Sequence, residues 1–533
     1  MSTYHAPGLY FERRDITPLV IGLPRSDIAG FAGIAMRGPL YEPVKVESWK
    51  QFVSSFGDFI PQGYLAYSVY GFFANGGRTC WISRVADRPS ANTARREFGE
   101  VAIVARSPGI WGNRIYVEPF LSGYKIVALQ LRYPDGSQQF IRAPFENVTI
   151  TRDNLFAIPQ DQLDARTQVQ SLVTISTVAV PTTVLEPAFL EGGTDGLADI
   201  GPEHFEEAFN SLETITDIAV MAAPDLMPKL PIEFRTKKPP LNCCDCTGKG
   251  VPSFGNQEPS EFPPAFSDDQ VKDLQHSLAA RAQSLRYRFA ILDGGGERAT
   301  PEQAIRWSKS LPGSCFSALY YPWILVDDPL RLTGLVRVVP PSGHIAGIFA
   351  RSDQRKGVHK PPMNEVLEAV SDVPFRIDET DHGELNDNNV NAVRIMPGRG
   401  VRVMGARTLF HENILLRYIN VRRLLSTIER ALEQSLNWAV FEPNNSHLWL
   451  EIDRIVRSFL ETLFRQGMLD GESSEQAYSV RCDDQTNPPA ESDLGRVICE
   501  VGVQPPYPAE FVVVTLGISK DGIQIREGKD QSV

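Results

Sequence analysis

The sequence predicts a multi-domain protein of the mixed α/β class, with an α/β core, an inserted β-rich domain and a C-terminal α/β domain. Three observations lead to this prediction. The chain has 533 residues, enough for roughly three to four domains. Strand-length apolar runs alternate with amphipathic helical patterns in most of it, which is typical of a parallel or mixed sheet covered by helices. Between residues 101 and 190 the helical patterns give way to short β-rich runs separated by turns.

The first part of the chain opens with an extended arm over residues 1–20, which contains two prolines and no helical period. A strand, two helices and a second strand follow. Ser48 is a suitable N-cap for the first helix, and Gly57 is a suitable stop. These elements are expected at residues 28–36, 49–56, 64–74 and 80–85.

The α/β pattern resumes after the β-rich insertion of residues 101–190. We therefore assign residues 21–100 and 191–378 to one α/β core domain. Residues 228–265 contain eight prolines and a cysteine cluster, which predicts a long surface loop. Strands are expected at 217–222, 288–292 and 317–321, and helices at 268–286 and from Pro301 onward.

A composition change after an acidic loop predicts a C-terminal α/β domain over residues 379–516. Two strongly amphipathic helices, Tyr418–Trp438 and His447–Gln466, each carry apolar side chains on one face and must pack on an apolar surface. A C-terminal arm is expected at residues 517–533. The strands available to cover the helices are expected at 400–404, 478–483, 496–503 and 511–516.

Composition and charge exclude several classes of protein. Lys and Arg number 53 against 65 Asp and Glu, and the net charge of −12 should repel a phosphate backbone, so nucleic acid is not expected as a partner. No apolar run approaches the length of a membrane helix, and the first residues resemble neither a secretion signal nor a lipidation site. Seven cysteines do not form a disulfide framework, so we expect reduced thiols and folding in a cytoplasm.

A search for catalytic motifs yields no enzyme and no cofactor site. The segment Thr247–Gly250 lacks the phosphate-loop spacing, and Gly294–Gly296 lacks the dinucleotide spacing. His411 has no second histidine at zinc-protease spacing, and Ser342 and His344 are too close in sequence to form a nucleophile–base pair by themselves.

Cys243, Cys244 and Cys246 form the only cluster of soft metal ligands in the sequence. Tetrahedral zinc would need a fourth ligand, for which Asp245 or His276 is available. We expect an exposed thiol loop without metal, and zinc binding is the alternative.

Two C-terminal segments carry opposite charge. Residues 391–430 contain eight arginines and two glutamates, whereas residues 471–500 contain seven acidic residues and two arginines. One interpretation is that the segments neutralise each other within a domain. The other is that they meet across subunits or face a charged partner.

Ten segments, in order along nearly the whole chain, resemble contractile tail sheath proteins of bacteriophages and related contractile injection systems. The loop 228–265 departs from the family pattern, so no function is carried onto it. The segments are Ala6–Glu12, Gly33–Pro39, Phe72–Gly77, Ser107–Asn113, Ala318–Trp323, Pro340–Gly347, Gly405–Leu409, Arg417–Leu424, Val440–Asn444 and Asn487–Pro489.

The resemblance implies a non-enzymatic subunit that forms stacked sixfold rings around an inner tube protein, contracts, and drives the tube through a target cell envelope. It also implies baseplate and terminal cap proteins as partners, no direct contact with nucleic acid or membrane, and a place in a phage virion or an injection particle. A cytosolic α/β enzyme and a receptor-binding or adhesion tail protein are the alternatives.

Two sets of assembly residues are expected. Leu9 and Phe11 in the N-terminal arm, and Ile523 and Ile525 in an alternating C-terminal strand, should link subunits by adding strands to a neighbour's sheet. The alternative for the C-terminal strand is a hairpin with the strand before it. Arg422, Arg423 and Arg430 lie off the apolar stripe of their helix and are expected to face the tube.

Overall fold

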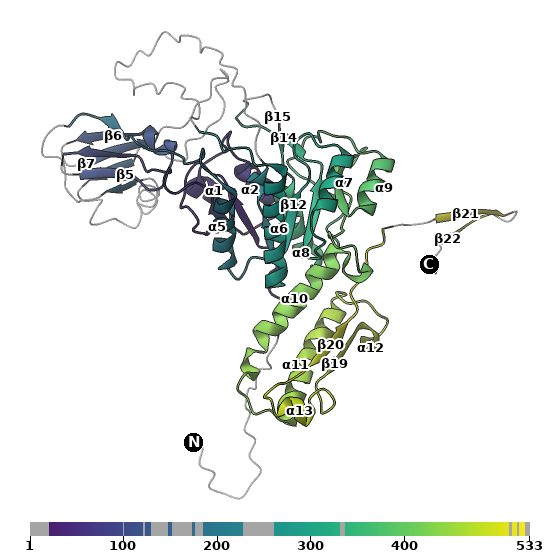
Figure 1. Cartoon of the computed structure of the whole chain (residues 1–533). Coiled ribbons are helices and arrows are strands. Elements are labelled where there is room, and N and C mark those ends of the chain that lie inside the picture. Colours follow the sequence, from purple (N-terminus) through teal and green to yellow (C-terminus); the bar gives the residue numbers. More distant parts are fainter. Residues whose placement is uncertain are drawn as a thin grey trace, which may run out of the picture. The chain divides into compact units, whose positions relative to one another are not determined.

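A nine-stranded mixed sheet forms the centre of the computed structural model (Figure 1). By its internal contacts the chain divides into two compact units, and the division falls between Ser426 and Thr427. The larger unit comprises Arg25–Ser426 and the part described from Tyr507 onward. The structure describes residues 21–99, 101–120, 123–128, 148–151, 173–175, 185–227, 261–330, 336–510, 514–519 and 522–527.

The order of strands across the large sheet is β16-β18-β17-β13-β12-β11-β1-β3-β2. The six strands from β17 to β3 run parallel, and β2, β18 and β16 pair antiparallel with their neighbours. The bounds are β1 Ala29–Gly33, β2 Val44–Val46, β3 Cys80–Arg84, β11 Val220–Ala222, β12 Phe289–Asp293, β13 Ser317–Tyr321, β16 Glu365–Val366, β17 Val390–Met396 and β18 Gly400–Val403.

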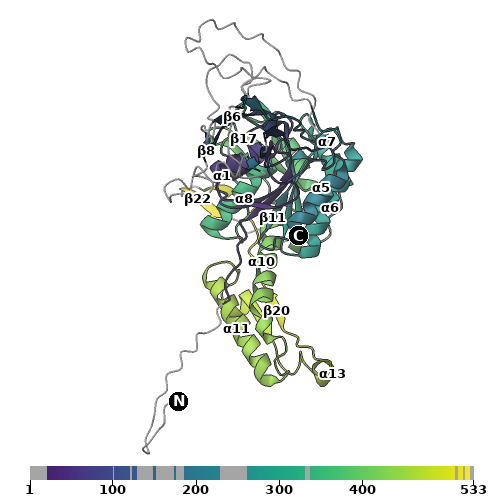
Figure 2. The ribbon, with the colours of Figure 1, turned by 90° about the vertical axis from the view of Figure 1, so that its left-hand side faces the viewer.

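The central strands are buried on both faces, because helices cover the sheet on both sides. Every residue of β1, β12 and β13 is buried, as expected for a parallel sheet between two helical layers. In Figure 2, α5 and α6 lie on one side of the strands and α8 on the other. The helices of this unit are α1 Trp49–Phe56, α2 Leu65–Ala74, α5 Pro202–Glu213, α6 Asp268–Leu285, α7 Pro301–Ser310, α8 Ser342–Lys356 and α9 Glu379–Asp387.

Capping residues define the helix starts that the sequence predicts. The side chains of Ser48, Ser267 and Thr300 each accept a hydrogen bond from a backbone N–H in the first turn of the following helix. The predicted helices over 49–56 and 268–286 and the helix starting at Pro301 are thereby confirmed, and their bounds in the structure lie within one residue of the prediction.

Helices α2 and α8 pack unusually closely, because glycines line their contact. A Cβ atom added at Gly343 would lie 2.3 Å from the backbone oxygen of Ser68, and one added at Gly347 would lie 2.5 Å from that of Phe72. Gly71 on α2 makes room for the buried ring of His344 in the same way. Burial alone lowers the pKa of His344 to about 3, so this imidazole is neutral inside the contact.

The inserted region forms two small antiparallel sheets around a core of its own, which includes Trp111, Ile115 and Val117. The segment Ser107–Asn113 ties this region to the large sheet. The Gly38 N–H donates to Ser107 Oγ (2.9 Å), and the Ile110 N–H donates to Asp195 Oδ1 (2.9 Å). The elements are β4 Arg95–Phe98, β5 Val101–Ala105, the 3₁₀ helix η1 Ile110–Arg114, β6 Ile115–Phe120, β7 Gly123–Ala128, β8 Val148–Thr151, β9 Val173–Ile175 and β10 Ala188–Phe189.

The smaller unit comprises Thr427–Pro506 and residues 21–24. Helix α10, Ile419–Ser435, runs across the division between the units, and helix α11, Ser446–Arg465, buries one apolar face within the smaller unit. The remaining elements are α12 Ser474–Ala477, β19 Tyr478–Arg481, α13 Pro489–Ser492, β20 Glu500–Val503 and the 3₁₀ helix η5 Asn437–Ala439.

The division between the units differs from the domain boundary that the sequence predicts between residues 378 and 379. Strands β17 and β18 follow that predicted boundary, yet they hydrogen-bond into the large sheet through β13. The acidic loop marks the start of α9, whose N-cap is Asp378, and α9 packs on β17. The composition change therefore coincides with a helix start inside the larger unit.

Two strand pairs and two short 3₁₀ helices complete the described fold. Strands β14, Ile324–Asp327, and β15, Val336–Val339, form an antiparallel pair. Strands β21, Val514–Ser519, and β22, Gly522–Glu527, form another. The remaining 3₁₀ helices are η3 Pro224–Leu226 and η4 Ile414–Leu416.

Candidate assembly surfaces

Among the described residues, the smaller unit contains one sheet of two strands, β19 and β20, and such a sheet is marginal in water without further strands or packing. Helix α11 covers one face of it. Tyr478 and Val480 point inward, and the hydroxyl of Tyr478 donates to Glu461 Oε2 of the helix (3.0 Å). Ser479 and Arg481 are exposed on the other face. Of the four strands expected to cover the two amphipathic helices, those at 478–483 and 496–503 form this sheet, whereas the strand at 400–404 pairs within the large sheet.

The outer edge of β20 has free backbone groups in the part of the chain that the structure describes. The Gln504 N–H donates to the Ala477 carbonyl, and alternation along the ladder turns the N–H and C=O groups of Val501 and Val503 away from β19. None of these four groups has a hydrogen-bond partner among the described residues. On the outer edge of β19, Arg457 Nη2 donates a hydrogen bond to the Val480 carbonyl (2.6 Å), so this acceptor is already in use. The β20 edge is therefore the more open place for an added strand.

An apolar loop projects from the same unit. Phe441 is fully exposed, Val440 is 60% exposed, and the backbone of Phe441 is left-handed, with φ of 70°. A bulky residue adopts this conformation at an energetic cost. Asn444 anchors the loop by donating to the carbonyls of Ser492 and Arg496 (3.2 and 2.9 Å). The motif Val440–Asn444 thus builds a fixed support for an exposed aromatic side chain.

Strands β21 and β22 near the C-terminus pair with each other over the register Val514↔Glu527 to Ser519↔Gly522. This hairpin is the alternative that the sequence left open for a single chain. The structure places Ile523 and Ile525 in β22. Leu9 and Phe11, predicted as the second linking arm, lie outside the described residues, and so do Cys243, Cys244 and Cys246.

Three arginines of the basic segment 391–430 pair with acids outside the acidic segment 471–500. Arg394 pairs with Glu379 (2.8 Å), and Arg407 makes a bidentate pair with Glu510 through Nε (3.0 Å) and Nη2 (2.5 Å). Arg423 pairs with Asp353 (2.6 Å). For these three side chains, mutual neutralisation of the two segments is therefore a wrong prediction, because their partners come from helices α9 and α8 and from residue 510.

The prediction that Arg422 and Arg423 face an inner tube is also corrected. These side chains are only 7% and 4% exposed. The Arg422 guanidinium lies 4.6 Å from the centre of the Phe316 ring. Arg423 lies 4.6 Å from that of Phe349, as well as pairing with Asp353. Guanidinium groups held in this way fix the start of α10 to the larger unit.

Burial acts against the ion pair of Arg423. It raises the pKa of Asp353, which the pairing with Arg423 and a hydrogen bond from Ser26 Oγ (2.7 Å) oppose. The Arg423 guanidinium also donates to the Ser26 carbonyl (2.9 Å), so the pair connects three segments of the unit. Arg430, by contrast, is half-buried, and its place on a tube-facing surface stays a prediction.

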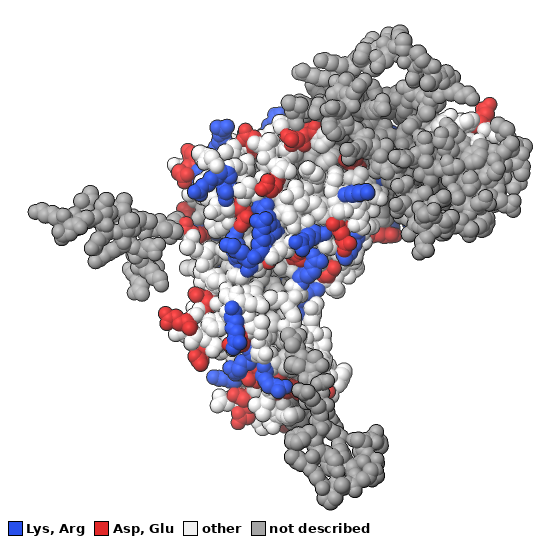
Figure 3. Space-filling view, turned by 180° about the vertical axis from the view of Figure 1, so that it is seen from behind, with Lys and Arg blue, Asp and Glu red and all other residues white. Residues whose placement is uncertain are grey.

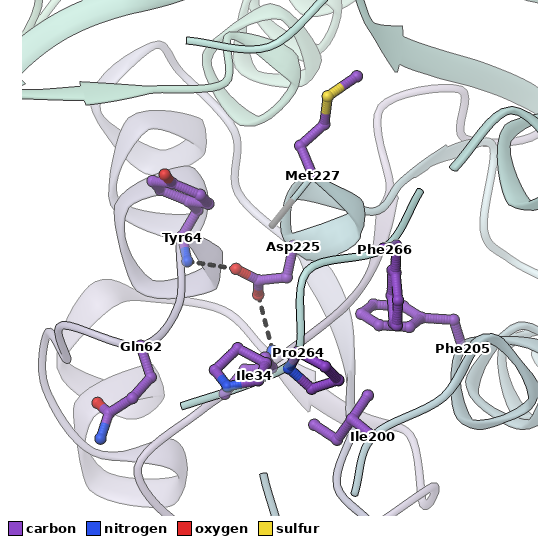
Figure 4. Close-up of a pocket in the computed structure, with 10 residues that line it drawn as sticks. Ile34, Gln62, Tyr64, Ile200, Phe205, Asp225, Met227, Pro264 and Phe266 are labelled. Atoms are coloured by element: carbon purple, nitrogen blue, oxygen red, sulfur yellow. Dashed lines mark hydrogen bonds between the residues drawn. The ribbon is translucent and has the colours of Figure 1, made fainter. Parts of the chain in front are cut away.

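One pocket lies beside β1 and η3, and Figure 4 shows its lining. Asp225 accepts hydrogen bonds from the backbone N–H groups of Ile34 (2.7 Å) and Tyr64. Burial raises the pKa of this carboxyl to about 6 against these hydrogen bonds. The other lining residues are mostly apolar, including Ile200, Phe205 and Phe266. The arrangement matches a carboxylate that joins two loops, and among the residues that the structure describes no Ser, Cys, Lys or His and no second carboxylate lines the pocket with it.

Basic and acidic side chains are interspersed on the face of the molecule shown in Figure 3. Within the described ranges, no group of three or more His, Cys, Asp or Glu side chains is arranged to hold a metal ion. Over the same part of the chain, no helix combines the length and apolarity that crossing a membrane requires.

Comparison with known families finds matches to two adjacent regions in the second half of the chain. Residues 262–409 match the central domain of phage tail sheath proteins, and residues 412–519 match the phage tail sheath C-terminal domain. These two regions are similar to the two domains of phage tail sheath proteins. The resemblance found in the sequence motifs is thereby confirmed. The region that matches the central sheath domain supplies β12, β13, β16, β17 and β18 of the large sheet, and the region that matches the C-terminal sheath domain supplies α10, α11, β19 and β20.

Curated relatives are distant and match in part. The tail sheath protein of Vibrio phage KVP40 is 24% identical over 186 residues, which are 33% of this chain and 26% of that protein. The tail sheath protein of Salmonella phage ViI is 20% identical over 231 residues, which are 42% of this chain and 35% of that protein. The chain thus spans about a quarter to a third of the length of these relatives.

Solved structures share the fold over nearly the whole chain. The sheath complex of the PVC extracellular contractile injection system, in its contracted state, has a TM-score of 0.56 at 19% identity, covering 98% of this chain and 99% of that one. The contracted helical sheath of the anti-feeding prophage has a TM-score of 0.55 at 20% identity, covering 97% and 100%. The sheath tail protein of Desulfitobacterium hafniense has a TM-score of 0.57 at 13% identity, covering 89% and 93%. The predicted mixed α/β fold is confirmed.

Proposed function

We propose that the chain is the structural subunit of a contractile sheath, which polymerises helically around an inner tube and shortens to drive the tube through a target cell envelope. The observation that carries the proposal is the pair of sheath domains at residues 262–409 and 412–519, on a fold shared with sheaths solved in the contracted state. Copies joined by head-to-tail contacts that do not close form an open helical lattice. Contraction needs two packings of such copies.

The linkage between subunits is strand addition at the two-stranded sheet of the smaller unit. The free edge of β20, at Val501 and Val503, offers backbone donors and acceptors to an incoming strand. The C-terminal arm with Ile523 and Ile525 has the alternating pattern for this role, and the N-terminal arm with Leu9 and Phe11 supplies the second link. Donation requires the β21–β22 hairpin of the single chain to open. Its own backbone hydrogen bonds are then replaced by bonds to the neighbour.

The other partners follow from the same role. Sheath structures similar to this chain include baseplate assemblies of the anti-feeding prophage, so we expect contact with a baseplate, a terminal cap and an inner tube protein. The rings are expected to be sixfold. Assembly is expected in a bacterial cytoplasm, and the product is either a phage tail or an injection particle. Because tail sheath proteins are structural, we assign the chain no catalytic residue.

Truncation of either arm tests the proposal. The purified full chain should form long tubes under negative stain, whereas a chain that ends at Leu516 or starts at Arg13 should sediment as a folded monomer and form none. A chain that ends at Glu527 is the matched control, because it keeps both strands of the hairpin, and it should assemble like the full chain. Normal tubes from either truncated chain, or a full chain that stays a small oligomer, would contradict the proposal.

A further inference from the structure

Two cysteines stand opposite each other at the end of the β19–β20 sheet. The paired register runs from Tyr478↔Val503 to Arg481↔Glu500. One further step along both strands brings Cys482 opposite Cys499. Cys482 is buried and Cys499 is half-buried, so one thiol is shielded while the other is reachable from solvent.

The position is one that a disulfide can bridge without moving the backbone. Because the Gln504 N–H donates to the carbonyl of Ala477, which stands opposite it, alternation along the ladder makes Cys482 and Cys499 a non-hydrogen-bonded pair. The Cα atoms of such a pair are about 4.5 Å apart, within the range of about 4.4 to 6.8 Å seen across disulfides. Both thiols are free in the structure. The two thiols also shift each other's pKa in opposite directions, lowering that of Cys482 and raising that of Cys499, as neighbouring thiols do.

The loop between the cysteines is already held in the conformation that a closed bridge requires. Asn487 donates to the Ile498 carbonyl (3.0 Å) and accepts from the Ile498 N–H (2.6 Å). It also donates to the Asp483 carbonyl (3.0 Å). These bonds bring both ends of the loop together next to the thiols. Closing the bridge in the folded chain therefore costs little additional conformational entropy.

We propose that Cys482 and Cys499 are a thiol pair that a small-molecule disulfide oxidises to a cross-strand bridge. The Cys499 thiolate attacks one sulfur of glutathione disulfide, which forms a mixed disulfide and releases one glutathione thiolate. The Cys482 thiolate then attacks the Cys499 sulfur and releases the second glutathione. Two protein thiols lose two electrons and two protons in total, and one glutathione disulfide gains them as two glutathione thiols.

The two thiols are not equally acidic. Pairing with Cys499 lowers the pKa of Cys482, against the effect of burial, whereas pairing with Cys482 and burial raise the pKa of Cys499. The thiolate therefore forms more readily at the shielded sulfur, which makes the second attack, and the first attack by Cys499 is the slower step. The reachable Cys499 is the entry point for the oxidant. Once closed, the bridge would fix β19 to β20 covalently, at the sheet that is proposed to receive strands from neighbours. The bridge would join the two strands in the single chain as well as in an assembly.

Peptide mapping tests the bridge. The full chain is incubated with glutathione disulfide, alkylated and digested with trypsin without reduction. Cleavage after Arg481 and Arg496 separates the cysteines into peptides 482–496 and 497–520, with one cysteine each. A linked pair of these peptides should appear in most molecules and disappear after dithiothreitol. The oxidised chain should also unfold at a higher temperature than the reduced chain, because the bridge restricts the unfolded state.

Two variants make the result specific. Cys499→Ser should abolish both the linked peptides and the thermal shift, whereas Cys315→Ser should leave both unchanged. Alkylation of both Cys482 and Cys499 after oxidation of the native chain would overturn the proposal. Linkage that appears only in denaturant would also overturn it, because it would reflect the unfolded chain rather than this geometry.

Discussion

Replacing Gly347 with alanine should destabilise the larger unit, even though alanine is the better helix former. The added Cβ would lie 2.5 Å from the Phe72 backbone oxygen and 2.7 Å from the Asn75 Cβ, both on the facing helix or its cap. Overpacking of this kind costs up to about 3 kcal/mol when the obstacle is backbone that cannot rotate away. Alanine regains about 1 kcal/mol of helix propensity. We therefore expect the free energy of unfolding to fall by about 2 kcal/mol.

Gly383 is the matched control for this substitution. It lies inside helix α9, and no atom stands within 4 Å of the Cβ that alanine would add. Gly383→Ala should therefore raise the free energy of unfolding by up to about 1 kcal/mol from propensity alone. Urea unfolding of the unassembled full chain, followed by circular dichroism, measures both variants. If Gly347→Ala were as stable as the parent while Gly383→Ala behaved as expected, the close packing of α2 on α8 would be refuted.

Three further predictions concern buried charge and the exposed loop. Burial raises the pKa of Asp293 to about 7 from an ordinary value of 3.8, against a hydrogen bond from the Ser342 N–H (2.9 Å). The folded chain therefore binds more protons than the unfolded one, and this group's stabilising contribution, complete below pH 3.8, should be lost as pH rises through about 7. Asp293→Asn should remove that part of the pH dependence in urea titrations, and an unchanged slope between pH 4 and 8 would count against it. Arg423→Met should cost about 3–5 kcal/mol in urea unfolding, because it leaves the Asp353 carboxylate buried without its charged partner, and a loss below 1 kcal/mol would argue against a structural role. Phe441→Ser should leave the free energy of unfolding within about 0.5 kcal/mol of the parent but shorten tubes under negative stain, since the exposed ring is expected to contact a second copy of the chain; full-length tubes would exclude that contact.

Helix α8 shows why part of the fold is not predictable from local sequence. Its residues, including Gly343, His344 and Gly347, are buried nearly all round, so they produce no amphipathic stripe, and two glycines lower the helix propensity. The element forms because α2 presents a surface that only small residues can approach. The amphipathic helix α11, whose buried residues recur on one face, could be predicted almost to its ends.

The arginines of α10 show that the side chains exposed on an assembly surface also cannot all be predicted from local sequence. The periodicity of that helix correctly marks Val421 and Leu424 as buried, but it cannot reveal that Phe349 and Asp353 on α8 bury Arg423 as well. An arginine beside an apolar stripe is usually exposed, and here a carboxylate and an aromatic ring reverse that expectation. The two-stranded β19–β20 sheet could be anticipated from its alternating strands, whereas the open edge of β20 became visible only with the register.

The most direct test of the proposed function is a helical reconstruction of the tubes formed by the purified full chain. The account predicts that β22 of one subunit leaves β21 and lies along the Val501–Val503 edge, or beside β19, in the small sheet of another subunit, so that this sheet has more than two strands. Tubes in which every chain keeps its β21–β22 hairpin and every β19–β20 sheet remains two-stranded would contradict it.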